Sequence, residues 1–142
     1  MSDLGERWDA VHKELPHKAT MRMTVYHGTG SCSLDAILAG KATLRSKPHL
    51  RKVHFSTTYV PEIARLFAIR KTPIGDFTKG LVTGVVIEFL LDGQEGRDFV
   101  RMRDPVCILE ENEIAVFNLR SLTPTGVWNN KDGKWVRTPW NE

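Results

Sequence analysis

The residues best suited to chemistry begin with a histidine that follows an apolar stretch. Val25-Tyr26-His27-Gly28-Thr29-Gly30 is typical of the end of a buried strand whose last side chain is the histidine. The two glycines that flank Thr29 leave the backbone bare, so a ligand can approach its N–H and C=O groups. The segment therefore predicts a ligand-contacting strand end, although a lone histidine in such a place more often makes structural hydrogen bonds.

Two later segments hold further candidates. Phe55-Ser56-Thr57 lies in an apolar stretch typical of a strand, and a predicted helix bearing Phe67 follows it. Three glutamates occur within four residues just before the strand Ile114 to Phe117. Taken singly, these features are as typical of core aromatics and of a solvated acidic turn as they are of a site.

In this order, however, the segments resemble the diphtheria-toxin-like ADP-ribosyltransferases, which share a His-Tyr-Glu triad with the poly(ADP-ribose) polymerases. In those enzymes the first strand ends in Tyr-His-Gly-Thr or a close variant. A later aromatic-Ser-Thr strand leads into a helix with a second aromatic, and a final strand opens with the catalytic glutamate. The matching segments here are Tyr26-His27-Gly28-Thr29, Phe55-Ser56-Thr57 and Asn112-Glu113-Ile114-Ala115-Val116-Phe117, and the resemblance covers roughly Thr24 to Leu119.

The resemblance implies that NAD⁺ is the co-substrate and assigns a role to each matching position. His27 would hydrogen-bond a ribose hydroxyl, and the Gly28 backbone would hold the nicotinamide carboxamide. Phe55 and Phe67 match the two aromatics that sandwich the nicotinamide ring. Glu113 would accept a hydrogen bond from the 2′-hydroxyl of the nicotinamide ribose.

Four more positions complete the predicted site. Thr29 and Ser56 belong to the matching motifs, and His54, where the polymerases have a strand tyrosine, is expected to reach the cofactor. Glu111 lies two positions before Glu113, as in the Glu-X-Glu of the arginine- and asparagine-modifying transferases, whose first acid directs the acceptor nucleophile. An exposed turn residue is the alternative for Glu111, and Glu110 is assigned to the surface. The predicted catalytic residues are therefore Glu113, His27 and Glu111, and no metal is expected.

The chain departs from the family at both aromatic positions, where it has phenylalanine instead of tyrosine. Phenylalanine keeps the flat face for stacking but lacks the hydroxyl. Twelve positions separate Phe55 from Phe67, one more than in the diphtheria pattern, so Leu66 or Tyr59 is an alternative neighbour of the ring.

The chemistry accounts for these residue types. Breaking the nicotinamide–ribose bond builds positive charge on the ribose, and a carboxylate beside it stabilises the oxocarbenium ion. Nicotinamide is already a good leaving group, so no acid need protonate it. Positioning and electrostatics would supply most of the catalysis.

Short elements that do not alternate regularly would position these residues, which predicts an α+β fold. The resemblance implies two small packed antiparallel or mixed β-sheets that form a central cleft with short flanking helices. The predicted helices are Leu4 to Leu15, Leu34 to Leu38 before Gly40, and one with Ile63, Leu66, Phe67 and Arg70 on one face and small Ala64 and Ala68 beside them. The predicted strands are Met23 to Tyr26, Val53 to Thr57, Leu81 to Leu91 with a turn at Asp92-Gly93, Val106 to Leu109, Ile114 to Phe117, and a hairpin from Gly126 to Val136 in which Trp128 and Trp135 can pair.

Length and composition indicate one globular domain. The chain has 142 residues, of which 41% are hydrophobic and 26% charged. We expect residues 1–22 to form a peripheral N-terminal helix, 23–119 the core and 120–142 a C-terminal hairpin. The only cysteines, Cys32 and Cys107, favour a reducing intracellular setting over a disulfide framework. The net charge is +3, and the basic stretch Lys41 to Lys52 can approach the NAD⁺ diphosphate or a nucleic-acid acceptor.

The resemblance and these observations predict a cytoplasmic NAD-dependent mono-ADP-ribosyltransferase with a protein or nucleic-acid acceptor. Its size suits a bacterial or phage-encoded effector, acting in a host cytoplasm, or the toxin of a toxin–antitoxin pair with an antitoxin or immunity partner. No membrane partner is expected. The alternatives are an NAD glycohydrolase, an RNA 2′-phosphotransferase, against which Glu113 argues, and a non-catalytic ADP-ribose or nucleic-acid binding module.

Overall fold

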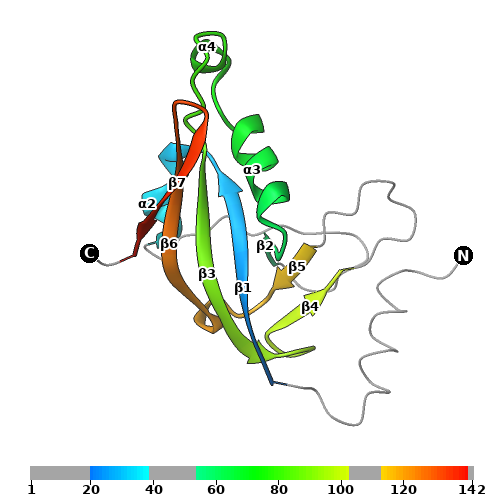
Figure 1. Cartoon of the computed structure of the whole chain (residues 1–142). Coiled ribbons are helices and arrows are strands. Elements are labelled where there is room, and N and C mark those ends of the chain that lie inside the picture. The colour runs from blue at the N-terminus through cyan, green and yellow to red at the C-terminus, as the bar shows by residue number, and fades with distance from the viewer. Residues whose placement is uncertain (1–19, 39–53, 103–112, 141–142) are drawn as a thin grey trace, which may run out of the picture.

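The computed structural model describes residues 20–38, 54–102 and 113–140 (Figure 1). The strands are β1 Thr20–Thr29, β2 Phe55–Thr58, β3 Val85–Gln94, β4 Phe99–Arg101, β5 Glu113–Val116, β6 Leu122–Lys131 and β7 Lys134–Pro139. The helices are α2 Leu34–Leu38, α3 Pro61–Arg70 and α4 Ile74–Phe77, with 3₁₀ turns η1 Ser31–Ser33 and η2 Leu119–Ser121. Several predicted features lie outside the described residues: the helix Leu4 to Leu15, Gly40 after the helix Leu34 to Leu38, the basic stretch Lys41 to Lys52, the strand Val106 to Leu109, and Glu110 and Glu111. None of the helices in the described ranges has the length and apolar run needed to cross a bilayer.

The strands form one seven-stranded sheet, in the order β4-β5-β2-β1-β3-β6-β7, in which neighbouring strands are antiparallel. This confirms the predicted α+β class. The expectation of two separate sheets is wrong, because the described strands form one sheet. This sheet has two parts, β4-β5-β2 and β1-β3-β6-β7. The junction between them is narrow, because β1 and β2 pair at one position, Tyr26 with Thr58. By contrast, β1 and β3 pair over ten positions, from Thr20–Gln94 to Thr29–Val85.

The larger apolar core contains side chains from both parts of the sheet. Its buried side chains are Val25, Phe55, Ile87, Phe89, Leu91, Phe99, Ile114 and Val116. The predicted alternation of Val85, Ile87, Phe89 and Leu91 on one strand face therefore places three of these side chains in this core. Leu34 and Ile37 of α2 pack against the same cluster, as their helical spacing predicts.

Several strands end at other residues than predicted, because their pairing with neighbouring strands continues further. β1 continues through His27 to Thr29, because these residues pair with Ile87 to Val85. β3 runs on to Gln94 instead of turning at Asp92-Gly93, since Gly93 pairs with Met21 of β1. The predicted C-terminal hairpin is confirmed, with a tight turn at Asp132-Gly133, where both φ angles are positive.

The two tryptophans of the hairpin do not lie opposite each other. Trp128 pairs with Arg137, and Trp135 pairs with Asn130, so the tryptophans are diagonal neighbours on one face. Both pack against a second buried cluster, which consists of Ala64 and Ala68 of α3 and Val86 of β3.

Helix α3 packs on this second face through its small residues. Pro61 occupies its first turn, where the missing N–H costs little. Ala64 and Ala68 are fully buried, whereas Leu66, predicted on one face with Ile63 and Phe67, is 54% exposed. The helix is thus turned so that its narrow alanine ridge meets the strands.

Gly28 in β1 and Gly84, directly before β3, make this close packing possible. A Cβ placed on Gly28 would lie 1.9 Å from the Ala64 carbonyl oxygen, and one on Gly84 would lie 1.8 Å from the Ala68 carbonyl oxygen. The C-terminal end of α3 is also tied to β3, because Thr72 donates to the Ala68 carbonyl and accepts from the Gly84 N–H. The helix therefore lies directly on the strand backbones.

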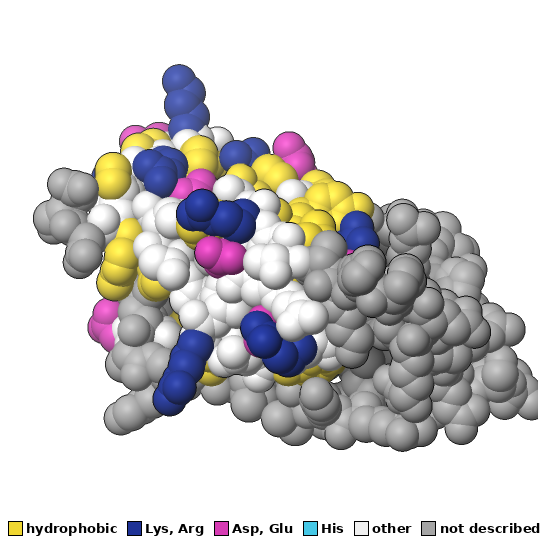
Figure 2. Space-filling view, turned by 90° about the horizontal axis from the view of Figure 1, so that it is seen from below, with side chains coloured by type: hydrophobic (Ala, Val, Ile, Leu, Met, Phe, Trp, Pro, Cys, Tyr) yellow, Lys and Arg dark blue, Asp and Glu magenta, His cyan; other side chains and the backbone are white. Residues whose placement is uncertain are grey.

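The surface seen from below in Figure 2 has a mixed charge, with Lys and Arg side chains beside Asp and Glu. Ion pairs join Arg22 to Asp92 at 3.5 Å and Arg101 to Glu95 at 3.1 Å. The Arg22–Asp92 pair is exposed on both sides and is worth at most about 1 kcal/mol, whereas Glu95 is 7% exposed and accepts two hydrogen bonds from Arg101. The Arg22–Asp92 pair therefore balances surface charge and contributes little to the stability of the sheet.

One buried carboxylate organises the turn after β3. Asp98 is 3% exposed and accepts hydrogen bonds from the Gln94 N–H, the Asn118 amide and the Arg97 guanidinium. The hydrogen bonds from Arg97, with those from Gln94 and Asn118, outweigh the effect of burial and lower the pKa of Asp98 to about 2.

We predict that Gly28→Ala lowers the free energy of unfolding by about 2–3 kcal/mol, because the added methyl group must push α3 off the sheet. The matched control is Gly75→Ala in α4, where a Cβ would meet nothing within 4 Å and a gain of up to about 1 kcal/mol is expected. Urea unfolding measures both. Equal midpoints for the two variants would contradict the packing described for α3.

We predict that Asp98→Asn destabilises the fold by about 1–3 kcal/mol at pH 7. The pKa of the Asp98 carboxyl is lowered from 3.8 to about 2 in the folded protein. Its contribution to the free energy of unfolding is therefore complete above about pH 4 and disappears as the pH falls toward 2. Unfolding midpoints of wild type and variant should therefore converge over that range. The control Asp92→Asn, at an exposed pair, should change stability by less than about 0.5 kcal/mol at either pH.

Candidate functional site

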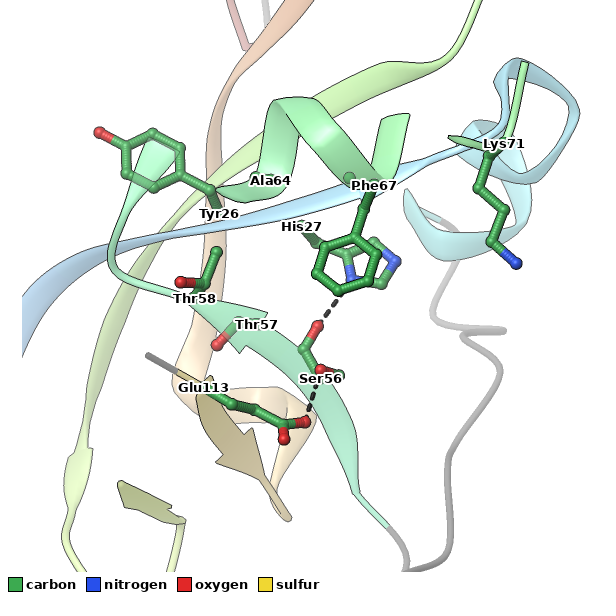
Figure 3. A pocket seen from close by; sticks show the side chains of 10 residues that line it. Tyr26, His27, Ser56, Thr57, Thr58, Ala64, Phe67, Lys71 and Glu113 are labelled. Carbon is green, nitrogen blue, oxygen red and sulfur yellow. Dashed lines mark hydrogen bonds between the residues drawn. The ribbon is translucent and has the colours of Figure 1, made fainter. Parts of the chain in front are cut away.

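A pocket opens where β1 and β2 separate beyond their single pairing position (Figure 3). Three elements of the sheet and one helix contribute to it. Its lining residues are Tyr26, His27 and Gly28 of β1, Ser56, Thr57 and Thr58 of β2, Ala64 and Phe67 of α3, Lys71 just beyond α3, and Glu113 of β5. Segments far apart in the sequence thus meet here, as the order of the three matching motifs predicted.

The register of β2 and β5 brings Glu113 into this pocket. Glu113 is the first residue of β5 and pairs with Thr58, so its side chain shares a face of the sheet with Thr58 and Ser56. The Ser56 hydroxyl donates to Glu113 Oε2 at 2.6 Å. Glu113 is only 5% exposed, so this carboxylate lies in a largely dry environment, where its charge acts strongly on a neighbouring ligand.

The same serine also orients His27. The His27 ring nitrogen Nδ1 lies 2.7 Å from the Ser56 carbonyl oxygen. A carbonyl only accepts, so Nδ1 carries the proton, and in the neutral ring Nε2 is then an acceptor. Ser56 therefore connects the histidine to the glutamate, one through its backbone and the other through its side chain.

Helix α3 supplies an aromatic ring and a cation to the pocket. Figure 3 shows the Phe67 side chain extending from α3 toward the side where His27 and Ser56 lie. Phe67 lines the pocket, whereas the alternatives Leu66 and Tyr59 are 54% and 46% exposed and are not among the lining residues. Lys71, which sequence reasoning missed, follows Phe67 by four residues, and this spacing, one helical turn, was the signal that could have identified it.

The structure does not bring Phe55 to the pocket, contrary to its predicted stacking role. Phe55 is 1% exposed and belongs to the apolar core, where its ring meets Phe89 edge-on at 6.0 Å. The reason is strand alternation: Ser56 faces Glu113, so its neighbour Phe55 faces the other way. Its ring centroid lies 4.3 Å from that of His27, so Phe55 supports the histidine ring.

Four other residues of the predicted site remain to be placed. Thr29 is 7% exposed at the end of β1 and does not line the pocket. His54 is fully buried and does not line the pocket either. It lies behind Glu113 and not at the cofactor position that was predicted for it. Gly28 does line the pocket, although the space beside its Cα is filled by α3. Glu111 lies outside the described residues.

Glu88 of β3 is a buried glutamate near the pocket residue Tyr26, and it is held in a structural ion pair. Burial raises the pKa of Glu88, but hydrogen bonds from Arg137 and Thr125 outweigh it, and the pKa is lowered. Burial and the nearby Glu88 charge raise the pKa of Tyr26, so its phenol stays protonated at neutral pH. Glu88 therefore has a structural role, and its ion pair with Arg137 lies at 2.8 Å.

The described residues of the pocket combine a buried carboxylate, an oriented imidazole, an aromatic face and a lysine at the rim. A carboxylate in a dry site stabilises positive charge that develops on a ligand. An imidazole of fixed tautomer binds a hydroxyl directionally, and an aromatic face holds a planar ring. The arrangement suits a ligand that is flat and polar at one end and develops cationic character in reaction.

Comparisons with protein-family models, curated proteins and solved structures find no match for this chain. The geometry of the pocket therefore has to carry the functional interpretation.

We predict that Ser56→Ala lowers the free energy of unfolding by about 1–3 kcal/mol, because it removes a donor from the buried Glu113 carboxylate. The control is Thr78→Ala, which removes an exposed hydrogen bond to Gly75 and should cost less than about 0.5 kcal/mol. Chemical unfolding at pH 7 compares the two. A Ser56→Ala protein as stable as wild type would show that the bond to Glu113 contributes nothing to stability.

Proposed function

We propose that the protein is an NAD-dependent ADP-ribosyltransferase that cleaves the nicotinamide–ribose bond and transfers ADP-ribose to a macromolecular acceptor. The observation that carries the proposal is the connection of His27 to Glu113 through Ser56, with contacts of 2.7 Å and 2.6 Å. These residues come from three strands, and they are the positions at which the sequence resembles the family. The ADP-ribosyltransferase-like fold is part of the same proposal.

The proposed reaction assigns one task to each described side chain. His27 binds a ribose hydroxyl through Nε2, and Phe67 lies against the nicotinamide ring. When the ribose C1′–nitrogen bond breaks, its electron pair goes to the ring nitrogen and neutralises the pyridinium. The Glu113 carboxylate stabilises the positive charge left on the ribose. The acceptor then bonds to C1′ and loses its proton.

The position of Lys71 supports a dinucleotide as the substrate. Its side chain is exposed and lines the pocket from the end of α3, while Glu113 lines it from β5 (Figure 3). A substrate with a diphosphate and a nicotinamide riboside would place its negative charges near the lysine and its developing positive charge near the glutamate. This charge arrangement would orient NAD⁺ in one direction.

We predict that Glu113→Gln lowers the rate of nicotinamide release from NAD⁺ by about 100-fold or more, because the neutral amide no longer stabilises the oxocarbenium charge. Glutamine keeps the size of the side chain, so the fold should survive. The control Glu62→Gln changes an exposed acid in the first turn of α3 and should leave the rate unchanged. Chromatographic measurement of free nicotinamide gives the rates, and a Glu113→Gln enzyme as fast as wild type would refute the proposal.

The acceptor is identified by incubating wild-type protein with labelled NAD⁺ and a cell lysate. Separate digestion with protease and nuclease then shows which macromolecule carries the label. Nicotinamide release without labelled macromolecules would favour a glycohydrolase instead of a transferase. Binding of ADP-ribose without nicotinamide release would favour a non-catalytic module.

A further inference from the structure

His54 is a fully buried polar side chain that no role described so far explains. It directly precedes β2, and its exposed fraction is 0%. Neither of its ring nitrogens has a hydrogen-bond partner among the described residues. Since an imidazole always carries at least one N–H group, burying it in this way costs stability, and a side chain retained at that cost calls for a reason.

A charged group close to the ring gives the reason. His54 Nε2 lies 3.4 Å from Glu113 Oε2, the same oxygen that accepts the Ser56 hydroxyl at 2.6 Å. His54 and Ser56 are two positions apart, and Thr58, the register partner of Glu113, is two positions further, so alternation puts all of them on one face of the strand. The Glu113 side chain extends back along this face toward His54.

This contact is slightly longer than an ordinary N–H···O hydrogen bond. Such distances are common before a ligand binds, and they shorten when the site closes on its substrate.

We propose that His54 is a positioning residue for Glu113. With Ser56 it holds Oε2 from the β2 side, which fixes the orientation of the carboxylate in the pocket. The role rests on the proposed function, in which Glu113 stabilises charge on the substrate. His54 does not line the pocket, so it acts through the glutamate and makes no contact with NAD⁺.

A positioning role differs from a packing role in what a substitution changes. His54→Phe keeps an aromatic ring of similar shape and removes the two unpartnered nitrogens, so the unfolding midpoint should stay the same or rise. Turnover should nevertheless fall by about 10-fold or more, because the glutamate carboxylate loses its orientation. The KM for NAD⁺ should change by less than about threefold, since no binding contact is removed.

The experiment measures kcat, KM and urea unfolding midpoints for wild type, His54→Phe and His54→Gln. Glutamine can place an amide N–H near the position of Nε2, so His54→Gln should recover part of the turnover that His54→Phe loses. The control is Ser121→Ala in η2, which removes a buried hydrogen bond to Asn118 away from the pocket and should lower stability but keep kcat. A His54→Phe enzyme with wild-type kcat, or one that loses no more turnover than Ser121→Ala, would overturn the proposal.

A double-mutant cycle separates this inference from the proposed function. If wild type releases no nicotinamide, the proposed function fails, and the contact is tested by stability alone. Unfolding of His54→Phe, Glu113→Gln and the double variant should then give non-additive changes in midpoint, because the two side chains interact. Additive changes would show that His54 and Glu113 are independent, and the positioning role would be wrong.

Discussion

The site depends on how closely α3 lies on the sheet. Gly28 and Gly84 present bare backbone to the helix, and the carbonyl groups of Ala64 and Ala68 occupy the space that side chains would take. Because interiors are close-packed, a single added methyl group at these glycines would lift the whole helix. The helix carries Phe67 and Lys71, so its distance from the strands also sets the width of the pocket.

A second constraint is the narrow junction between the two parts of the sheet. Since β1 and β2 pair at one position, the strands can diverge beyond it and leave room for side chains between them. There the Ser56 carbonyl accepts from the His27 ring, and the Ser56 hydroxyl reaches Glu113. A full ladder between these strands would hold the backbones together and close the pocket.

The sequence indicated several residues of the candidate pocket but misplaced Phe55 of β2. His27, Ser56, Phe67 and Glu113 line one pocket, as the order of the motifs indicated. Phe55 was assigned to the ligand because of its aromatic type, and the parity of the strand sends it to the core. Neighbouring residues of a strand face opposite sides, so Phe55 and Ser56 cannot both point into the pocket, and a four-residue strand has too few positions to show from its pattern which of them does.

The sequence by itself determined the elements and the chemical groups that they carry. The alternation from Val85 to Leu91, Pro61 at the start of α3 and the small residues at 64 and 68 are local signals, because each depends on neighbours within a few positions. Only the tertiary structure decided that Ser56 contacts Glu113, which is 57 residues away, and that His54 is buried behind it. That arrangement follows from the register of β2 on β5, and the register is set by packing of the common core, which no local stretch of the chain encodes.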